Sequence, residues 1–303
     1  MPDYKTHSIH SEIVVSNINN KRVLIHQEDI KKFSFGPDSL LTTDYQLFDY
    51  QHSHYTKVFF ECLLSKIKEY KLQDNEKVMS FLYGQLDHFV LDLVAHPLIY
   101  YMTENMPSKH KIKPHALIEM WIDDYVMNKY NKRFENYYTY KPLINLELSK
   151  IINEIYLKIY GKSNIANKYE NGIYSLTNFD KVRYSKSYFI KKICRSLNIG
   201  DLFYNRNIKR VLPFLNLERK TITNPITGKI FKDSFDDLWY KSIMISSELI
   251  EDVNNYLYSD KELNNYYIKN NISYNTGLPC VKNEEFKYVK KYKIKWNKLY
   301  FFY

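Results

Sequence analysis

Apolar residues recur along much of the chain at the spacing of an amphipathic α-helix, which buries one face and leaves the other in water. This pattern predicts helices over residues 8–19, 55–70, 113–130, 145–160, 184–198 and 234–258. Glycine and proline are scarce, with 7 and 9 residues among 303, which disfavours β architectures rich in turns. The chain is therefore predicted to be all-α, a single-domain multi-helix bundle.

Two segments interrupt the helical pattern. Gly36 and Pro37 predict a loop over residues 34–41. Residues 224–239 predict a turn or short hairpin, which ends in Ser234-x-x-Asp237, a spacing typical of a capping box at the start of a helix.

No linker and no internal repeat divides the sequence, so residues 1–303 are predicted to form one domain. Its candidate metal ligands fall within residues 1–120, and a helical remainder spans 121–258. Basic and aromatic residues alternate in the tail at 259–303, which favours an extended segment at the end of the chain.

The most apolar predicted helix carries a line of polar side chains. It begins at an N-cap, Asp74 or Asn75, and is predicted to stop at Pro97. His88, Asp92 and His96 stand four residues apart, so they lie on one stripe of the helix. A buried carboxylate without a partner costs several kcal/mol. No lysine or arginine occurs between residues 77 and 109, so the carboxylate requires a metal ion or a cation from elsewhere.

The helix at 113–130 repeats this arrangement with His115 and Glu119, again four residues apart. Such a pair often arises by chance, and a single buried histidine is more often a hydrogen-bonded core residue than a ligand. Five candidates on two helices nevertheless favour metal binding, because zinc takes imidazole nitrogen and carboxylate oxygen. Further candidates precede them in the sequence: Asp38, and either His52 or His54.

All 9 histidines lie within the first 115 residues, which indicates a use for imidazole in this part of the chain. His10, His26 and His110 are interpreted as surface or structural residues. The 3 cysteines, Cys62, Cys194 and Cys280, are far apart, which argues against a disulfide framework and against a thiolate zinc site.

The net charge of +10 suggests attraction to partners that carry phosphate, such as nucleic acid or anionic lipid. An equally good interpretation is that the lysines reflect an AT-rich genome and are spread over a solvated surface. The N-terminus has no apolar signal core, and no apolar run approaches the ~18 residues that span a bilayer. A soluble cytoplasmic protein is therefore expected.

These motifs together resemble the bacterial zinc-dependent phospholipase C family, in particular its intracellular branch. The likeness runs from residue 1 to about 258. It rests on the opening Met1-Pro2…Thr6-His7, on "GPD" at 36–38, on His52 ahead of Phe59-Phe60, on "HFVLDLVAHP", on "HALIE" and on "NPITGKIFKDSFDDLW".

The resemblance implies an all-helical fold that holds up to three zinc ions, as in the related secreted phospholipases and the fungal single-strand nucleases. It assigns one ion to Asp38, His52, His88 and Asp92, with His52 favoured over His54. It assigns a second ion to Asp92 as a bridge, to His7, and to Pro2 as the N-terminal residue after removal of Met1. It assigns the third ion to His96, His115 and Glu119.

The activity that the resemblance implies is hydrolysis of a phosphodiester, with a phospholipid headgroup bond as the first substrate. A water between two zinc ions would attack, and Asp38 is the candidate catalytic residue that orients it or accepts its proton. One alternative is a nuclease or nucleotide phosphodiesterase on the same site. Another is a non-catalytic protein with structural zinc. The charge allows peripheral contact with an anionic membrane, and no stable protein partner is inferred.

Overall fold

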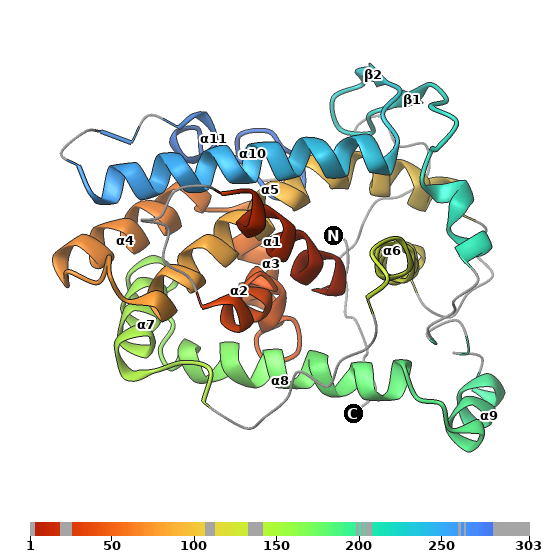
Figure 1. Ribbon diagram of the computed structural model, residues 1–303, viewed down its shortest axis with the longest axis horizontal. Coiled ribbons are helices and arrows are strands. Elements are labelled where there is room, and N and C mark those ends of the chain that lie inside the picture. Colours follow the sequence, from red (N-terminus) through yellow and green to blue (C-terminus); the bar gives the residue numbers. More distant parts are fainter. Residues whose placement is uncertain are drawn as a thin grey trace.

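The computed structural model describes residues 4–18, 26–106, 113–132, 142–197, 200, 203, 208–259, 262–263 and 265–280, and helices dominate these ranges (Figure 1). In chain order the α-helices are α1 (Tyr4–Asn17), α2 (Gln27–Phe33), α3 (Tyr45–Ser53), α4 (Thr56–Glu69), α5 (Glu76–Asn105), α6 (Pro114–Lys129), α7 (Leu146–Tyr160), α8 (Ile165–Arg183), α9 (Tyr188–Ser196), α10 (Phe235–Leu257) and α11 (Tyr266–Lys269). Short 3₁₀ helices are η1 (Gly36–Leu40), η3 (Ile208–Arg210) and η4 (Leu212–Phe214). The predicted all-α multi-helix fold is confirmed.

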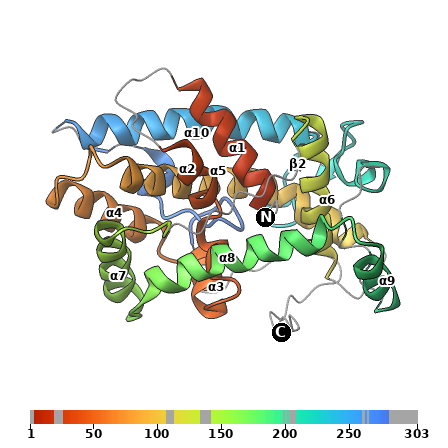
Figure 2. The ribbon, with the colours of Figure 1, turned by 60° about the horizontal axis from the view of Figure 1, so that its bottom comes forward.

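Helix α5 lies at the centre of the helical assembly. α10 packs along it, and α1, α2 and α6 also pack against it (Figures 1 and 2). Its apolar side chains point in every direction and are buried, as expected for a helix that is hydrophobic all round. The polar side chains in the middle of α5 are therefore removed from water and need partners within the protein.

The predicted stop at Pro97 is wrong, because α5 continues through this residue to Asn105. Proline has no N–H, so the carbonyl of Leu93, four residues earlier, receives no helical hydrogen bond from it. Gly277 lies over that carbonyl, and a Cβ at this glycine would be only 3.2 Å from the Leu93 oxygen. Buried residues on both sides of the proline, including Leu98 and Ile99, hold the helix in the core.

Several other boundaries differ from the sequence pattern. The pattern misses α2, α3 and α8, makes α9 too long, starts α1 at residue 8, and treats η1 as part of a loop. The first turn of α1 buries Lys5, Thr6 and His7, and the buried face of α8 includes Asp180 and Arg183. Polar residues at these buried positions conceal the alternation of apolar and polar faces on which the prediction depends.

The predicted helix caps are confirmed, and a short hairpin is present, although its first strand precedes the predicted range of 224–239. β1 (Ile222–Thr223) pairs antiparallel with β2 (Ile230–Phe231). At the start of α10, Ser234 Oγ accepts from the N–H of Asp237 at 3.2 Å, and the Asp237 carboxylate accepts from the N–H of Ser234 at 2.9 Å. Asn75 caps α5 by accepting from the N–H of Val78 at 3.1 Å.

Within the described part of the chain, none of the helices combines the length and apolar character needed to cross a lipid bilayer. The tail predicted to be extended begins with α11 and an isolated bridge between Ile272 and Pro279. The rest of this tail, at 281–303, lies outside the described residues, as do Pro2 and His110.

Candidate metal centre

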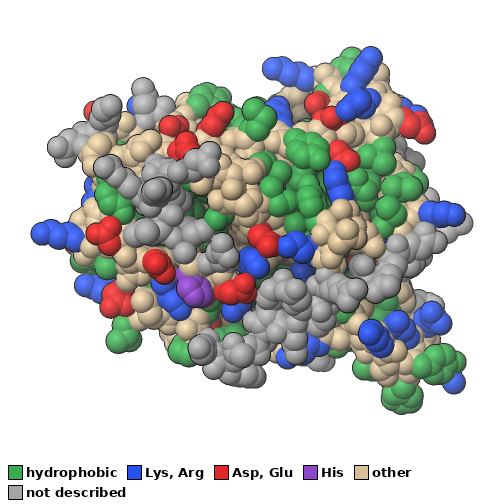
Figure 3. Space-filling view, in the orientation of Figure 1, with side chains coloured by type: hydrophobic (Ala, Val, Ile, Leu, Met, Phe, Trp, Pro, Cys, Tyr) green, Lys and Arg blue, Asp and Glu red, His purple; other side chains and the backbone are tan. Residues whose placement is uncertain are grey.

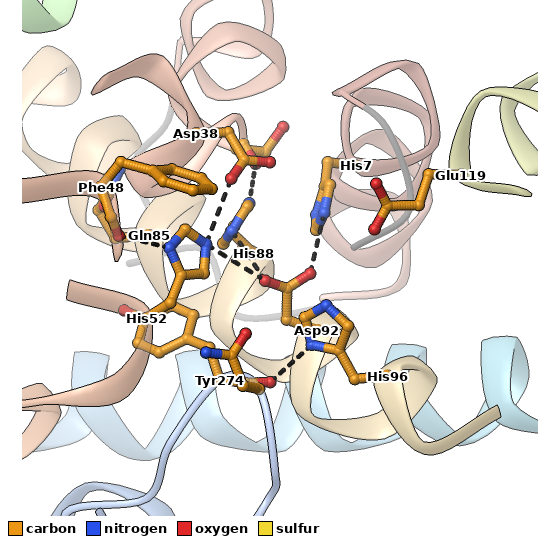
Figure 4. Close-up of polar contacts among 12 residues, drawn as sticks. His7, Asp38, Phe48, His52, Gln85, His88, Asp92, His96, Glu119 and Tyr274 are labelled. Carbon is orange, nitrogen blue, oxygen red and sulfur yellow. Dashed lines mark hydrogen bonds and ion pairs between the residues drawn. The ribbon is translucent and has the colours of Figure 1, made fainter. Parts of the chain in front are cut away.

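Eight of the side chains singled out in the sequence come together around α5. Figure 4 labels all of them except His115. They form three groups whose ligand atoms lie within 4.8 Å of one another: His7, His88 and Asp92; Asp38, His52 and His88; and His96, His115 and Glu119. His88, Asp92 and His96 lie on α5 itself. The others come from α1 (His7), η1 (Asp38), α3 (His52) and α6 (His115 and Glu119). We call these eight residues the metal centre.

Asp92 lies between two of the groups, with one oxygen turned toward each. Its Oδ1 is 3.2 Å from His7 Nε2. Its Oδ2 is 3.1 Å from His88 Nε2 and 3.7 Å from His52 Nε2. The same nitrogen of His52 is also 3.2 Å from Oδ1 of Asp38. The two oxygens of Asp92 therefore face different donor sets, as a bridging carboxylate requires.

Backbone carbonyls orient three of the imidazoles. The Nδ1 atoms of His52, His88 and His96 donate to carbonyl oxygens: that of Phe48 at 2.7 Å, Ser34 at 2.9 Å and Tyr274 at 2.8 Å. A hydrogen bond at Nδ1 selects the tautomer whose Nε2 carries a lone pair. Each ring thus presents an unprotonated Nε2 and has a fixed orientation.

Gly36 allows η1 to approach α5 closely enough to bring Asp38 into the metal centre. Its φ of +55° lies in the left-handed region, which favours glycine. A Cβ at this position would lie 2.3 Å from Cγ of His88, which is well inside contact distance. The "GPD" motif therefore places a carboxylate beside an imidazole at a separation that other residues would prevent.

In the two groups that share His88, buried donor atoms lack hydrogen-bond partners among the described residues. Both ring nitrogens of His7 and both carboxylate oxygens of Asp92 are in this state, as are Asp38 Oδ1, His52 Nε2 and His88 Nε2. Each unsatisfied buried polar group costs about 1–3 kcal/mol. Imidazole nitrogens and carboxylate oxygens are ligands that zinc accepts. The residues present therefore fit a zinc site.

The electrostatic environment favours the metal-binding protonation states of His7, His96 and Asp92, whereas for His88 it favours the protonated ring. Burial, together with His88, lowers the pKa of His7, and burial lowers the pKa of His96 well below its usual value. Burial would raise the pKa of Asp92, but His88 and His96 hold it well below the ordinary range. For His88, burial is outweighed by Asp92 and Asp38, which raise its pKa.

The third group lies nearer to solvent than the other two. His115 Nε2 is 2.7 Å from Glu119 Oε1, and these side chains are 23% and 14% exposed. Tyr100 stacks on both His96 and His115, with ring centroids 5.0 and 4.9 Å apart. Burial would raise the pKa of Glu119, but His115 lowers it, which keeps the carboxylate ionised.

His10 belongs to a separate, structural arrangement. Its Nδ1 is 2.8 Å from Asp87 Oδ1, and its Nε2 is 2.7 Å from Ser242 Oγ. This order of side chains resembles a hydrolytic triad, but all three are fully buried and no substrate reaches the serine. They link α1, α5 and α10. His26 is the exposed histidine of an ion pair with Asp29.

Two contributions to the metal centre could not be foreseen from motifs. Tyr274 receives the Nδ1–H of His96 on its carbonyl and donates its own N–H to the carbonyl of His52 at 3.0 Å. Asp123 accepts from the N–H of Thr6 at 2.8 Å and from its hydroxyl at 2.6 Å, next to His7. Backbone partners carry no residue signature, and a contact between residues 117 apart leaves no local pattern.

The structure separates the two histidine alternatives. His52 is buried in the metal centre, whereas His54 Nδ1 is 2.7 Å from Ser53 Oγ and its ring stacks on Tyr50. We expect His52→Asn to lower zinc affinity at least about tenfold, because it removes a ligand nitrogen. His54→Asn is the matched control and should retain wild-type affinity in a chelator titration. Equal retention of zinc by both variants would exclude His52 as a ligand.

Comparison with known proteins gives one match. Neither the curated proteins nor the solved structures include a significant relative of this chain. The family described as "Zinc dependent phospholipase C" matches residues 6–193, a range that contains every residue of the metal centre. The chain belongs to the zinc-dependent phospholipase C family.

Proposed function

We propose that this protein hydrolyses phosphodiesters with three zinc ions held at the metal centre, and that phospholipid headgroup esters are its substrates. Family membership supports a zinc-dependent hydrolase. The observation that supports the site most strongly is the set of buried imidazole and carboxylate atoms that have no hydrogen-bond partner within the described residues.

In this proposal Asp38, His52, His88 and Asp92 would hold one ion. Asp92 and His7 would contribute to a second ion, together with the N-terminal amine of Pro2. Both oxygens of Asp92 are needed, which agrees with their separate 3.2 and 3.1 Å contacts to His7 and His88.

The third ion is held by His96, His115 and Glu119. The last two side chains are partly exposed, so this group lies nearer to solvent than the other two. A structural zinc site fills all four positions with protein ligands, whereas a catalytic one has three and keeps a position for water or substrate. The three ligands proposed for this ion therefore favour catalysis over the structural alternative.

Zinc ions bound close together lower the pKa of a water and neutralise charge on phosphoryl oxygens. Asp38 has an oxygen that accepts no hydrogen bond within the described residues, and this atom faces the metal centre. We assign to Asp38 the role of orienting the attacking water or accepting its proton. The imidazoles, fixed by their carbonyl partners, keep this arrangement rigid.

A direct test compares a soluble choline-phosphate ester with single-stranded DNA as substrates for the purified protein. We expect turnover of the ester, loss of turnover after chelation, and recovery on addition of zinc. Cleavage of DNA without turnover of the ester would favour the nuclease alternative. Bound zinc without either activity would favour a structural role.

Glu119→Gln is expected to lower affinity for the third zinc at least about tenfold, because a neutral amide is a much poorer ligand than a carboxylate. α6 should remain folded, since Gln and Glu have similar helix propensity. The control is Glu154→Gln, which removes a carboxylate 3.0 Å from Lys66 outside the metal centre. A chelator titration measures zinc retention, and wild-type retention in the Glu119 variant would remove this residue from the site.

The N-terminal amine is expected to be essential for activity. α1 begins at Tyr4, and its first turn is held by Asp123 through Thr6, so an added segment would displace the amine from the ion beside His7. We expect an N-terminal tag to reduce turnover strongly, and a C-terminal tag to have little effect. Equal turnover of the two tagged proteins would show that Pro2 is not a ligand.

A further inference from the structure

Helix α9 (Tyr188–Ser196) stands apart from the packed helices at one end of the molecule (Figures 1 and 2). None of its residues is buried. Phe189 is 69% exposed, Ile193 42% and Leu197, directly after the helix, 54%. These three positions are four residues apart and lie on one face of the helix.

The other face of α9 is basic. At 100° per residue, Lys191 and Arg195 lie on the side opposite Phe189 and Ile193, and Lys192 lies between this basic side and Phe189. No Asp or Glu occurs between residues 180 and 201. Figure 3 shows basic side chains gathered on one side of this helix and hydrophobic ones at its outer edge.

We propose that α9 docks the protein on an anionic phospholipid surface, with Phe189, Ile193 and Leu197 entering the boundary between headgroups and acyl chains. A short helix with an apolar aromatic face and a basic face is suited to lie in this interface. The basic residues attract anionic headgroups. A second copy of the chain fits this face less well, because two α9 helices would bring like charges together.

Docking through α9 would also place the metal centre near lipid, and this part of the inference rests on the proposed function. Arg183, at the end of α8, is 3.3 Å from Asp123 and 2.7 Å from Asp124 on α6. α6 also carries His115 and Glu119. A short segment, 184–187, then joins α8 to α9. The docking helix is thus joined through one buried ion-pair network to α6, the helix that carries His115 and Glu119 of the partly exposed third group.

The experiment measures sedimentation of the full-length zinc-loaded protein with vesicles of phosphatidylcholine alone, or of phosphatidylcholine mixed with phosphatidylglycerol. We expect binding to the mixed vesicles, weakening with salt, and little binding to neutral ones. The variant Phe189→Ser/Ile193→Ser should bind about tenfold more weakly or worse, because it loses two inserted side chains. Met244→Ser is the control, since it removes an equally exposed apolar side chain (64%) from α10.

Zinc content and turnover of the soluble ester, measured on the same samples, separate this inference from the proposed function. Both should be unchanged in the α9 variant. Absence of binding to mixed vesicles, or equal binding by the α9 variant and wild type, would overturn the docking role. The inference would also be overturned if the wild type dimerised without binding vesicles and the α9 variant were monomeric. Vesicle binding without ester turnover would leave the docking role intact and contradict the proposed function.

Discussion

Asp92→Asn is expected to remove more than one equivalent of zinc from the purified protein. The reason is that Asp92 presents one oxygen to His7 and the other to His88 and His52. An amide keeps the size of the side chain but has no charge and only one oxygen to offer. The binding of both ions that share the carboxylate should therefore be weakened. Elemental analysis after dialysis measures how much zinc is lost.

Asp87→Asn provides a matched control. Asp87 is also a fully buried aspartate on α5, but its partner is His10, outside the metal centre. We expect this variant to lose stability and to keep its zinc. If Asp92→Asn retained the zinc content of the wild type, Asp92 would not be a ligand, and the two-ion arrangement would be excluded.

Arg183→Met is expected to destabilise the protein by about 3–5 kcal/mol, the usual effect of removing one partner from a buried charge network. The Arg183 side chain is fully buried and contacts Asp123 at 3.3 Å and Asp124 at 2.7 Å. Methionine approximates the length of the lost side chain, so the effect should arise from the loss of the guanidinium charge beside Asp123, while Asp124 keeps its ion pair with Arg210. Chemical denaturation gives the change in free energy of unfolding.

The loss of stability caused by Arg183→Met should grow as the pH rises. Burial raises the pKa of Asp123 to about 7, although Arg183 and Thr6 oppose this rise. Without the guanidinium the carboxyl group should hold its proton still more strongly in the folded state. The folded state then binds more protons than the unfolded state above the ordinary carboxyl pKa, so stability falls with increasing pH.

Arg219→Met is the control for Arg183→Met. Arg219 makes two hydrogen bonds to the Asp237 carboxylate, at 2.9 and 2.8 Å, but it lies on the surface, where solvent screens the pair. We expect the free energy of unfolding of this variant to be close to that of the wild type. A similar small change in Arg183→Met would show that the α6–α8 network is not a source of stability.

The sequence predicts those parts of the metal centre that follow from spacing on one helix. His88, Asp92 and His96 recur every four residues, as do His115 and Glu119, and the structure places both sets around one site. Asp38 and His52 or His54 were candidates by residue type alone, and only the family resemblance assigned Asp38 and His52 to an ion, because no helical period relates η1 or α3 to α5.

Long-range contacts account for most of what the sequence does not predict. Pro97 ends a helix by local rules, yet tertiary packing carries α5 past it. Arg183 appears in the sequence as one basic residue among many, although its partners on α6 make it fully buried. Tyr274 contributes through its backbone, and only the three-dimensional arrangement shows that it orients His96.

Zinc content, combined with anomalous diffraction at the zinc edge, tests the metal centre most directly. We expect protein that begins at Pro2 to contain about two to three zinc equivalents, as the three donor groups imply. Anomalous peaks should lie beside Asp92 on both sides and beside Glu119. Protein purified without chelators that contains less than one equivalent, or zinc peaks away from these residues, would contradict the assignment.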